Sequence, residues 1–514
     1  MKPIRLIRSF LTVGFWTLMS RILGFVREIL ILNYLGPGVA LDAFVAAFRL
    51  PNMFRRFFAE GAFNAAFVPL FSQKYEAGED ALAFANDAFN FLATAVLLLT
   101  AVAMIFMPAL VWVTAAGFYG DERFDMTVGF GRIVFPYILC MSLAALFSGA
   151  LNATGRFAAA AAAPVLLNAL VVPVLIIGAT VGGDVVKWLV WTIPVAGVAQ
   201  LSLVWIAATR AGLSLRPGLP RWTKDMRKMV YVAVPAALAS GVMQINLVVG
   251  QIVASTTPGA VSWLFAADRL YQLPLGVVGI AVGIVLLPDL SRRLKANDEK
   301  GARYAFSRAG EFTFFLTVPC AVALLVIPLP LVSVLFERGA TTPDDSAAIA
   351  AAVAIYGVGL PAFVLQKLLQ PLFFAQNDTK TPFYYALTAM IINAALAFGL
   401  SPLLGWMAPA VATSASAWVM VVQLGIGARR FGPVAKFDDR LRKRLWMICL
   451  CSAVMAAVLW AVTLILSPWL GQAGWRYVAL LALISSGGVA YFVSAHVTHA
   501  FRFSDLKSAA RRSF

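Results

Sequence analysis

The sequence predicts an all-α, polytopic membrane protein of fourteen transmembrane helices. Three observations support this class: 61% of the 514 residues are hydrophobic, 13% are charged, and the mean hydropathy is +0.84. A soluble protein of this length needs far more polar residues to cover its surface, so the composition excludes a soluble globular fold.

Apolar stretches long enough to cross a bilayer follow one another along the whole chain. Glycine, proline and clusters of charged residues separate these stretches. The second is the least apolar, because it carries three arginines. The fourteen predicted spans cover about residues 10–34, 39–62, 82–113, 127–153, 158–181, 186–209, 228–256, 260–290, 309–336, 346–375, 381–404, 407–428, 445–467 and 475–499.

Lysine and arginine are distributed unevenly between the two sets of predicted loops. The loops on the side of the N-terminus, together with both termini, hold 29 of the 41 basic residues, and the opposite loops hold four. Basic residues are enriched on the cytoplasmic side of membrane proteins, so both termini are predicted to be cytoplasmic. The same asymmetry explains most of the net charge of +17 without a nucleic-acid partner.

The remaining eight basic residues fall inside the spans or at their edges. Each costs about 2.5–3.5 kcal/mol near the centre of a bilayer, so together they are expected to line a hydrated cavity. For three of them, Arg56, Arg132 and Lys367, snorkelling to the interface or pairing with an acid such as Glu60 is an equally good interpretation. The eight are Arg21, Arg27, Arg49, Arg55, Arg56, Arg132, Arg269 and Lys367.

An internal repeat relates the second span to the eighth. The segment PGVALDAFVAAFRL at 37–50 resembles PGAVSWLFAADRL at 258–270, and VPLFS at 68–72 resembles LPDLS at 287–291. Repeats of this kind enclose a substrate site in many transporters. We therefore predict two pseudo-symmetric six-helix lobes, 1–222 and 223–436, around a central cationic cavity, followed by 437–514 with two further helices and a tail. Arg49 and Arg269 occupy equivalent places in the two lobes.

Several segments resemble the MurJ (MviN) family of lipid II flippases, over essentially the whole chain. They are SRILGFVRE at 20–28, DAFVAAFRLPNMFRRFFAEGAFNAAFVP at 42–69, FPYIL at 135–139, ADRLYQLPLGVVGIAVGIVLLPDLS at 267–291 and NDTKTP at 377–382. The resemblance implies the fold of the multidrug/oligosaccharidyl-lipid/polysaccharide exporters, with the last two helices forming a groove for a lipid tail. It also implies transport of lipid II, the undecaprenyl-pyrophosphate-linked peptidoglycan precursor, from the cytoplasmic to the outer leaflet of the bacterial inner membrane.

The predicted substrate-binding residues combine this resemblance with the repeat. Guanidinium groups suit a pyrophosphate, because they bind its oxygens in pairs and keep their own charge. The primary set is Arg21, Arg27, Asp42, Arg49, Arg55 and Arg269, and the secondary candidates are Glu28, Arg56, Glu60 and Ser262. Hinge candidates are Pro51, which lacks a backbone donor, and Gly276, Gly279 and Gly283, which permit bending or close helix packing.

No catalytic or metal-binding constellation is predicted, and no cofactor is expected. The only histidines, His496 and His499, lack a third ligand. Asp378 matches a loop that holds sodium in some members of the family, but Phe374 offers no oxygen, so no sodium site is predicted and the coupling ion is left open. The expected partners are lipid II, membrane lipids, and cell-wall synthesis or division proteins.

Two alternatives to lipid II transport remain at this stage, besides transport of another polyprenyl-linked saccharide. A cation-coupled drug exporter of the same fold needs acids and aromatic residues in its cavity, whereas this chain has an excess of intramembrane arginine. A membrane enzyme acting on a polyprenyl phosphate needs an acid–base or metal cluster, which the sequence lacks.

Overall fold

The computed structural model of the chain describes residues 3–56 and 63–500. Within these ranges the protein is built from helices and contains no β-strand, which confirms the predicted all-α class. Helices dominate because a bilayer offers no hydrogen-bonding solvent, and a helix satisfies its backbone groups internally. The chain divides into a first unit, Met1–Ser262 with Arg338–Thr341, and a second unit, Trp263–Glu337 with Thr342–Phe514.

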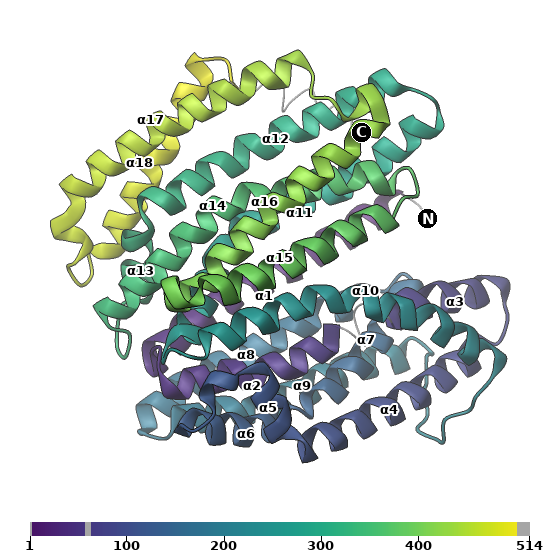
Figure 1. The fold of residues 1–514 in the computed structure, drawn as a ribbon. Coiled ribbons are helices and arrows are strands. Elements are labelled where there is room, and N and C mark those ends of the chain that lie inside the picture. Colours follow the sequence, from purple (N-terminus) through teal and green to yellow (C-terminus); the bar gives the residue numbers. More distant parts are fainter. Residues whose placement is uncertain (1–2, 57–62, 501–514) are drawn as a thin grey trace. The chain divides into compact units, whose positions relative to one another are not determined.

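The first unit contains ten α-helices within the described ranges. In Figure 1, α1 packs on α8 and α8 on α9, while α2 packs on α6. They are α1 (Pro3–Leu35), α2 (Val39–Arg55), α3 (Asn64–Ala77), α4 (Ala81–Ile105), α5 (Met107–Thr114), α6 (Glu122–Val134), α7 (Tyr137–Ala153), α8 (Ala158–Val181), α9 (Val185–Arg210) and α10 (Lys224–Ala254), with the short 3₁₀ turn η2 (Ala116–Phe118).

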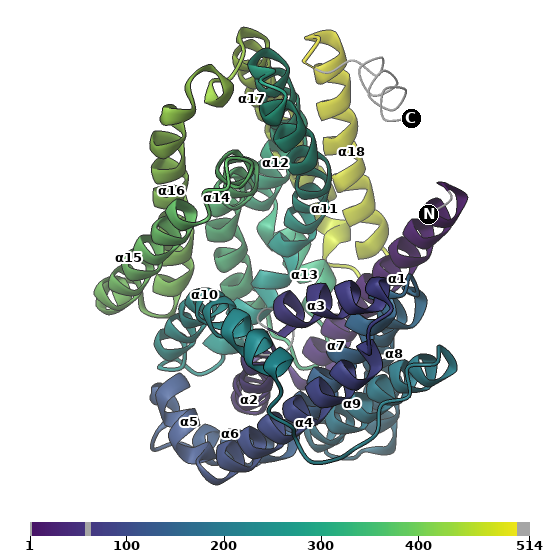
Figure 2. The same ribbon diagram turned by 90° about the vertical axis from the view of Figure 1, so that its right-hand side faces the viewer.

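The second unit contains α11 except for its first three residues, and the helices that follow. Here α14 packs on α12 and α16, and α17 packs on α12 and α18 (Figure 2). They are α11 (Ala260–Lys295), α12 (Glu299–Val326), α13 (Pro328–Phe336), α14 (Pro343–Phe374), α15 (Lys380–Leu404), α16 (Ala408–Ala428), α17 (Asp439–Leu470) and α18 (Arg476–Val497), with the 3₁₀ turns η3 (Gly405–Met407) and η4 (Arg429–Ala435).

Helix ends follow from local sequence. Aspartate or threonine side chains accept a backbone N–H from the first turn of the helix that follows, as Asp184 does for α9 and Thr223 for α10. Gly78 and Gly182 end α3 and α8 in the left-handed conformation, which glycine adopts at little cost.

The core of the first unit is rich in phenylalanine. Phe67 stacks on Phe63, Phe71 and Phe84, with ring centroids 5.2 to 5.7 Å apart. These rings join α3 to α4 in one buried cluster, so the short helix α3 is fixed by packing.

Nine helical stretches among the described residues are long and apolar enough to cross a membrane, judged by length and composition. Two of them combine several elements: Glu122–Ala153 contains α6 and α7, and Lys380–Ala435 contains α15 and α16 with the turns η3 and η4. The membrane class is therefore supported, while the count of fourteen spans and the division at residues 222 and 436 stay predictions.

Candidate functional site

Asp42 lies in the first turn of α2 with its carboxylate fully buried. Its Oδ1 accepts hydrogen bonds from the backbone N–H of Ser262 at 2.9 Å and from the Ser262 hydroxyl at 2.6 Å, and its Oδ2 accepts from the N–H of Gly259 at 2.7 Å. These backbone donors stand at the start of α11, where they have no partner within the helix. Asp42 therefore caps α11 from another helix, and its charge favours that helix end.

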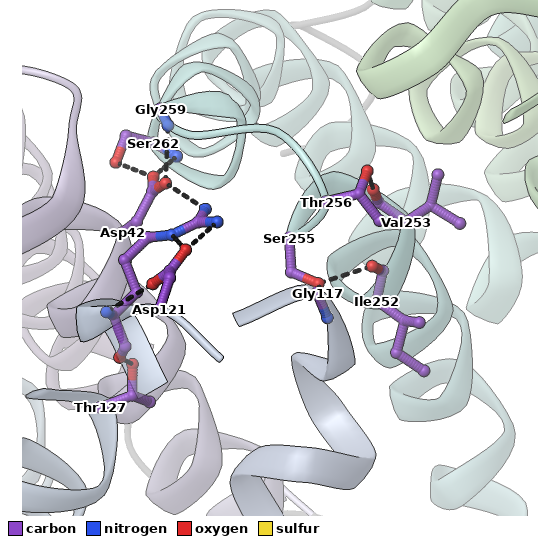
Figure 3. A network of polar contacts seen from close by, with 11 residues as sticks. Asp42, Gly117, Asp121, Thr127, Ile252, Val253, Ser255, Thr256, Gly259 and Ser262 are labelled. Atoms are coloured by element: carbon purple, nitrogen blue, oxygen red, sulfur yellow. Dashed lines mark hydrogen bonds and ion pairs between the residues drawn. The ribbon is translucent and has the colours of Figure 1, made fainter. Parts of the chain in front are cut away.

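Arg123, the second residue of α6, pairs with both Asp42 and Asp121, and Figure 3 shows these two carboxylates beside Gly259 and Ser262. One Nη atom lies 3.5 Å from Oδ2 of Asp42, and Nε donates to Asp121 at 2.7 Å. The guanidinium also lies over the ring of Phe118, 4.5 Å from its centroid. Arg123 is only 3% exposed, which makes it a deeply buried cation. The carboxylates of Asp42 and Asp121 balance its charge.

Residues 255–259 connect α10 to α11, and Ser255 holds the beginning of this connection. The Ser255 hydroxyl accepts the N–H of Gly117 at 2.9 Å and donates to the carbonyl of Ile252 at 2.7 Å (Figure 3). A Cβ atom on Gly117 would lie 2.5 Å from the backbone N of Thr256, so this approach requires glycine. The connection 255–259 is thus fixed by the first unit at both ends.

Arg27 is fixed by a second network, between α1 and α8. Its two Nη atoms donate to Oδ1 of Asn168 at 2.8 Å and to Oε1 of the buried Glu28 at 2.6 Å. Asn168, itself 4% exposed, donates in turn to the carbonyl of Ser20 at 3.0 Å. The carboxylate of Glu28 and the amide of Asn168 fix the orientation of the guanidinium plane of Arg27, and Glu28 balances its charge.

The other predicted residues of the first unit lie along α1 and α2. Arg21 is exposed on α1, and Arg49 donates to the carbonyl of Leu247 in α10 at 3.3 Å. Arg55 is the last residue of α2, Arg56 follows it, and Glu60 lies outside the described residues. Pro51 is buried, and α2 continues through it.

Arg269 lies in α11, in the second unit, with its guanidinium 4.5 Å from the centroid of the Phe265 ring. It is the tenth residue of α11, as Arg49 is the eleventh of α2, so the repeat places the two at similar depths in their helices. Gly276 is partly buried in α11. Gly279 and Gly283 belong to a stretch of which the structure describes only the helical backbone.

Sequence reasoning missed Arg123 and Asn168. Arg123 lies between the predicted spans 82–113 and 127–153 and is one of the four basic residues of the opposite loops, yet its partner Asp42 is 81 residues away in sequence. Asn168 carries the only amide side chain of the apolar segment 158–181, and a buried amide in such a segment normally has a hydrogen-bonding partner. An isolated amide in an apolar segment was therefore the sequence feature that could have identified Asn168.

No group of three or more His, Cys, Asp or Glu residues suited to a metal ion occurs in the described part of the chain. Asp378, in the loop before α15, accepts the N–H of Thr381 at 3.0 Å and pairs with Arg430. The hydrogen bond from Thr381, followed by the guanidinium of Arg430, holds the pKa of Asp378 below its usual value.

Comparison with known proteins identifies the family. The model of the family described as lipid II flippase MurJ matches residues 31–485. The chain belongs to this family. A probable lipid II flippase MurJ of Rhizobium tropici is 45% identical over 91% of this chain and 89% of its own length, and that of Rhizobium meliloti is 43% identical over 99% and 96%.

Solved structures agree with this membership. A lipid II flippase MurJ in an inward closed conformation matches with a TM-score of 0.80 and 25% identity, over 95% of this chain and 98% of that one. An inward-facing MATE transporter matches with a TM-score of 0.69 over 84% and 99%, but its 14% identity shows a shared fold alone. The resemblance drawn from the sequence motifs is therefore confirmed.

Proposed function

We propose that the protein is a flippase that moves lipid II across the bacterial inner membrane. The observation that carries this proposal is the family match over residues 31–485, supported by relatives of up to 45% identity that are described as lipid II flippases. A multi-pass membrane protein of this family is a transporter, with no chemical step to catalyse.

The proposed binding groups for the pyrophosphate are the arginines of α1, α2 and α11. Arg21, Arg49 and Arg55 belong to the first unit, Arg269 belongs to the second, and Arg27 contributes hydrogen-bond donors fixed by its two partners. Guanidinium groups suit this ligand because each offers several donors to phosphate oxygens without losing its charge.

Transport by alternating access from the cytoplasmic to the periplasmic leaflet, with both termini cytoplasmic, completes the proposal. Only the hydrophilic headgroup has to cross, since the isoprenoid tail stays in an apolar environment. With an inside-negative potential, an anionic headgroup moves outward with the field, at about 2.3 kcal/mol per charge per 100 mV. Collapse of the potential in vesicles is therefore expected to slow transport.

The test is a reconstituted assay that follows labelled lipid II between leaflets, with Arg269→Glu as the variant. Reversing this charge places a carboxylate where a phosphate oxygen is proposed to bind, so we expect transport to fall by about tenfold or more. Arg292→Glu is the matched control, because Arg292 lies in the same helix with a side chain 79% exposed.

Protein yield in the membrane and elution as a single species show that each variant has inserted and folded. Normal transport by Arg269→Glu, together with normal transport by Arg21→Glu, would contradict the assignment of the site. Failure of the unaltered protein to move lipid II, under conditions where a known flippase does so, would contradict the function itself.

A further inference from the structure

A buried carboxylate organises three arginines where α12 meets α17 in the second unit. Glu311 of α12 is 4% exposed, and its side chain contacts the guanidinium groups of Arg308 and Arg444. Nε of Arg440 lies 3.5 Å from Oε1 of the same carboxylate. Ion pairs of this kind fix the direction of each guanidinium group, so the arginines are arranged before any ligand arrives.

Positive charge exceeds negative charge in this region. Arg308 also contacts Asp438, the N-cap residue of α17, and Asp439 is the first residue of that helix. The described residues of this region therefore place five basic side chains, those at 308, 440, 442, 443 and 444, beside the three carboxylates at 311, 438 and 439. The next two basic residues of α17, Arg442 and Lys443, are exposed. We call this set the α17 basic site: Arg308, Arg440, Arg442, Lys443 and Arg444.

A further cation, Arg303, lies beside the site and forms no ion pair with an acidic residue in the described part of the chain. Arg303 donates to the backbone carbonyls of Lys436 at 3.0 Å and Phe437 at 3.1 Å. Carbonyl oxygens are neutral, so these bonds hold the side chain in place and leave its charge uncompensated by a carboxylate. An anion that binds next to Arg303 would therefore experience a positive electrostatic potential.

The α17 basic site lies at the edge of an apolar helix. Residues 440–444 directly precede the predicted span 445–467, and α17 is long and apolar enough to cross a membrane. Trp446 follows the basic residues and is 79% exposed. Exposed tryptophan next to lysine and arginine is typical of the level of the lipid headgroups.

We propose that the α17 basic site binds the phosphate of an anionic phospholipid in the adjacent leaflet. The charge excess and the headgroup level favour such a lipid over a zwitterionic one, and preset guanidinium groups suit phosphate oxygens. This binding is separate from lipid II transport. It would anchor α17 and its neighbour α18 to the surrounding membrane.

The first test compares two matched pairs of basic residues. Arg442 and Lys443 are the fourth and fifth residues of α17, and Arg227 and Lys228 are the fourth and fifth of α10; all four are exposed. Delipidated protein in detergent is titrated with phosphatidylglycerol, with phosphatidylcholine as the neutral probe, and the unfolding temperature is recorded. A ligand that binds the folded state raises this temperature.

We expect phosphatidylglycerol to raise the unfolding temperature more than phosphatidylcholine does. The double variant Arg442→Gln/Lys443→Gln should lose about half or more of that rise, while Arg227→Gln/Lys228→Gln should keep most of it. Equal losses in the two variants would show a general surface-charge effect and would overturn the proposed site. A lack of any difference between the two lipids would also overturn it.

The second test uses Glu311→Gln, for which two explanations predict opposite signs. If only total charge matters, removing a carboxylate should strengthen the response to phosphatidylglycerol. If Glu311 presets the arginines, the response should weaken. The unfolding temperature without lipid shows whether this variant folds; if it does not, the paired variants of the first test decide alone.

A third arm identifies the source of the phosphate. Farnesyl diphosphate carries the diphosphate group of the proposed transport substrate on a short isoprenoid chain. If it produces the stabilisation that depends on Arg442 and Lys443 while phosphatidylglycerol produces none, the site belongs to the transport substrate and the phospholipid assignment is wrong.

Discussion

Replacing Asp42 with asparagine tests whether one buried charge holds the start of α11. The substitution keeps the volume of the side chain and removes its charge. The amide has a single oxygen, so it can accept from Ser262 or from Gly259, and its NH₂ group must face the remaining donors. Arg123 also loses one of its two carboxylates.

The expected magnitude follows from these contacts. Removing one partner of a buried ion pair costs about 3–5 kcal/mol, and because Arg123 keeps Asp121 we expect the lower end, about 3 kcal/mol. Asp184→Asn is the control, because Asp184 also caps a helix of the first unit and pairs with a lysine, but its side chain is 50% exposed. That change should cost about 1 kcal/mol or less.

The assay is equilibrium unfolding in mixed micelles, which gives the free energy of unfolding for each variant. A double-mutant cycle with Ser262→Ala adds a second criterion, since the hydroxyl of Ser262 bonds directly to Asp42 at 2.6 Å. We expect a coupling energy of about 1 kcal/mol between the two positions. Equal losses for Asp42→Asn and Asp184→Asn, or a cycle without coupling, would refute the reasoning.

Two further predictions concern a close approach and a titrating loop. Gly117→Ala should lower the free energy of unfolding by about 1–3 kcal/mol, because its Cβ would lie 2.5 Å from the backbone N of Thr256; Gly129→Ala, with nothing within 4 Å, should be tolerated in the same assay. The pKa of Asp378 is held below its usual value by Thr381, so its stabilisation is present above the unfolded pKa and disappears as the pH falls through the folded pKa. The difference in unfolding temperature between the unaltered protein and Asp378→Asn should therefore shrink from about pH 7 to about pH 3, and a constant difference would contradict this role.

Sequence patterns predicted an all-helical chain, but they missed α3, between the predicted spans 39–62 and 82–113, and some of the interruptions between helices. The predicted span 82–113 is divided at Phe106 into α4 and α5, and 309–336 is divided at Ile327 into α12 and α13. In both cases a proline, Pro108 or Pro328, stands at the first positions of the second helix. Hydropathy does not register such a break, because proline interrupts the helix without making the segment polar.

The networks around Asp42 and Arg27 could be predicted only in part. Both residues were selected from the motifs, but their partners Arg123 and Asn168 lie 81 and 141 positions away in sequence. Periodicity and local motifs carry no information on such pairs, which tertiary packing brings together. The sequence therefore selected Asp42 and Arg27 as charged residues of the predicted spans, and the structure was needed to show what balances each of them.

The distinction between balanced and unbalanced charge bears on ligand binding. Arg123 is buried between two carboxylates and Arg27 is paired with Glu28, whereas Arg21 is exposed and forms no ion pair within the described part of α1. Salt screens the attraction between an exposed cation and an approaching anion strongly, and it screens fixed, partly buried hydrogen bonds much less. If Arg21 and Arg27 bind a pyrophosphate as proposed, the contribution of Arg21 should weaken as the ionic strength rises. The contribution of Arg27 should persist, because Glu28 and Asn168 already hold its guanidinium group in a fixed direction.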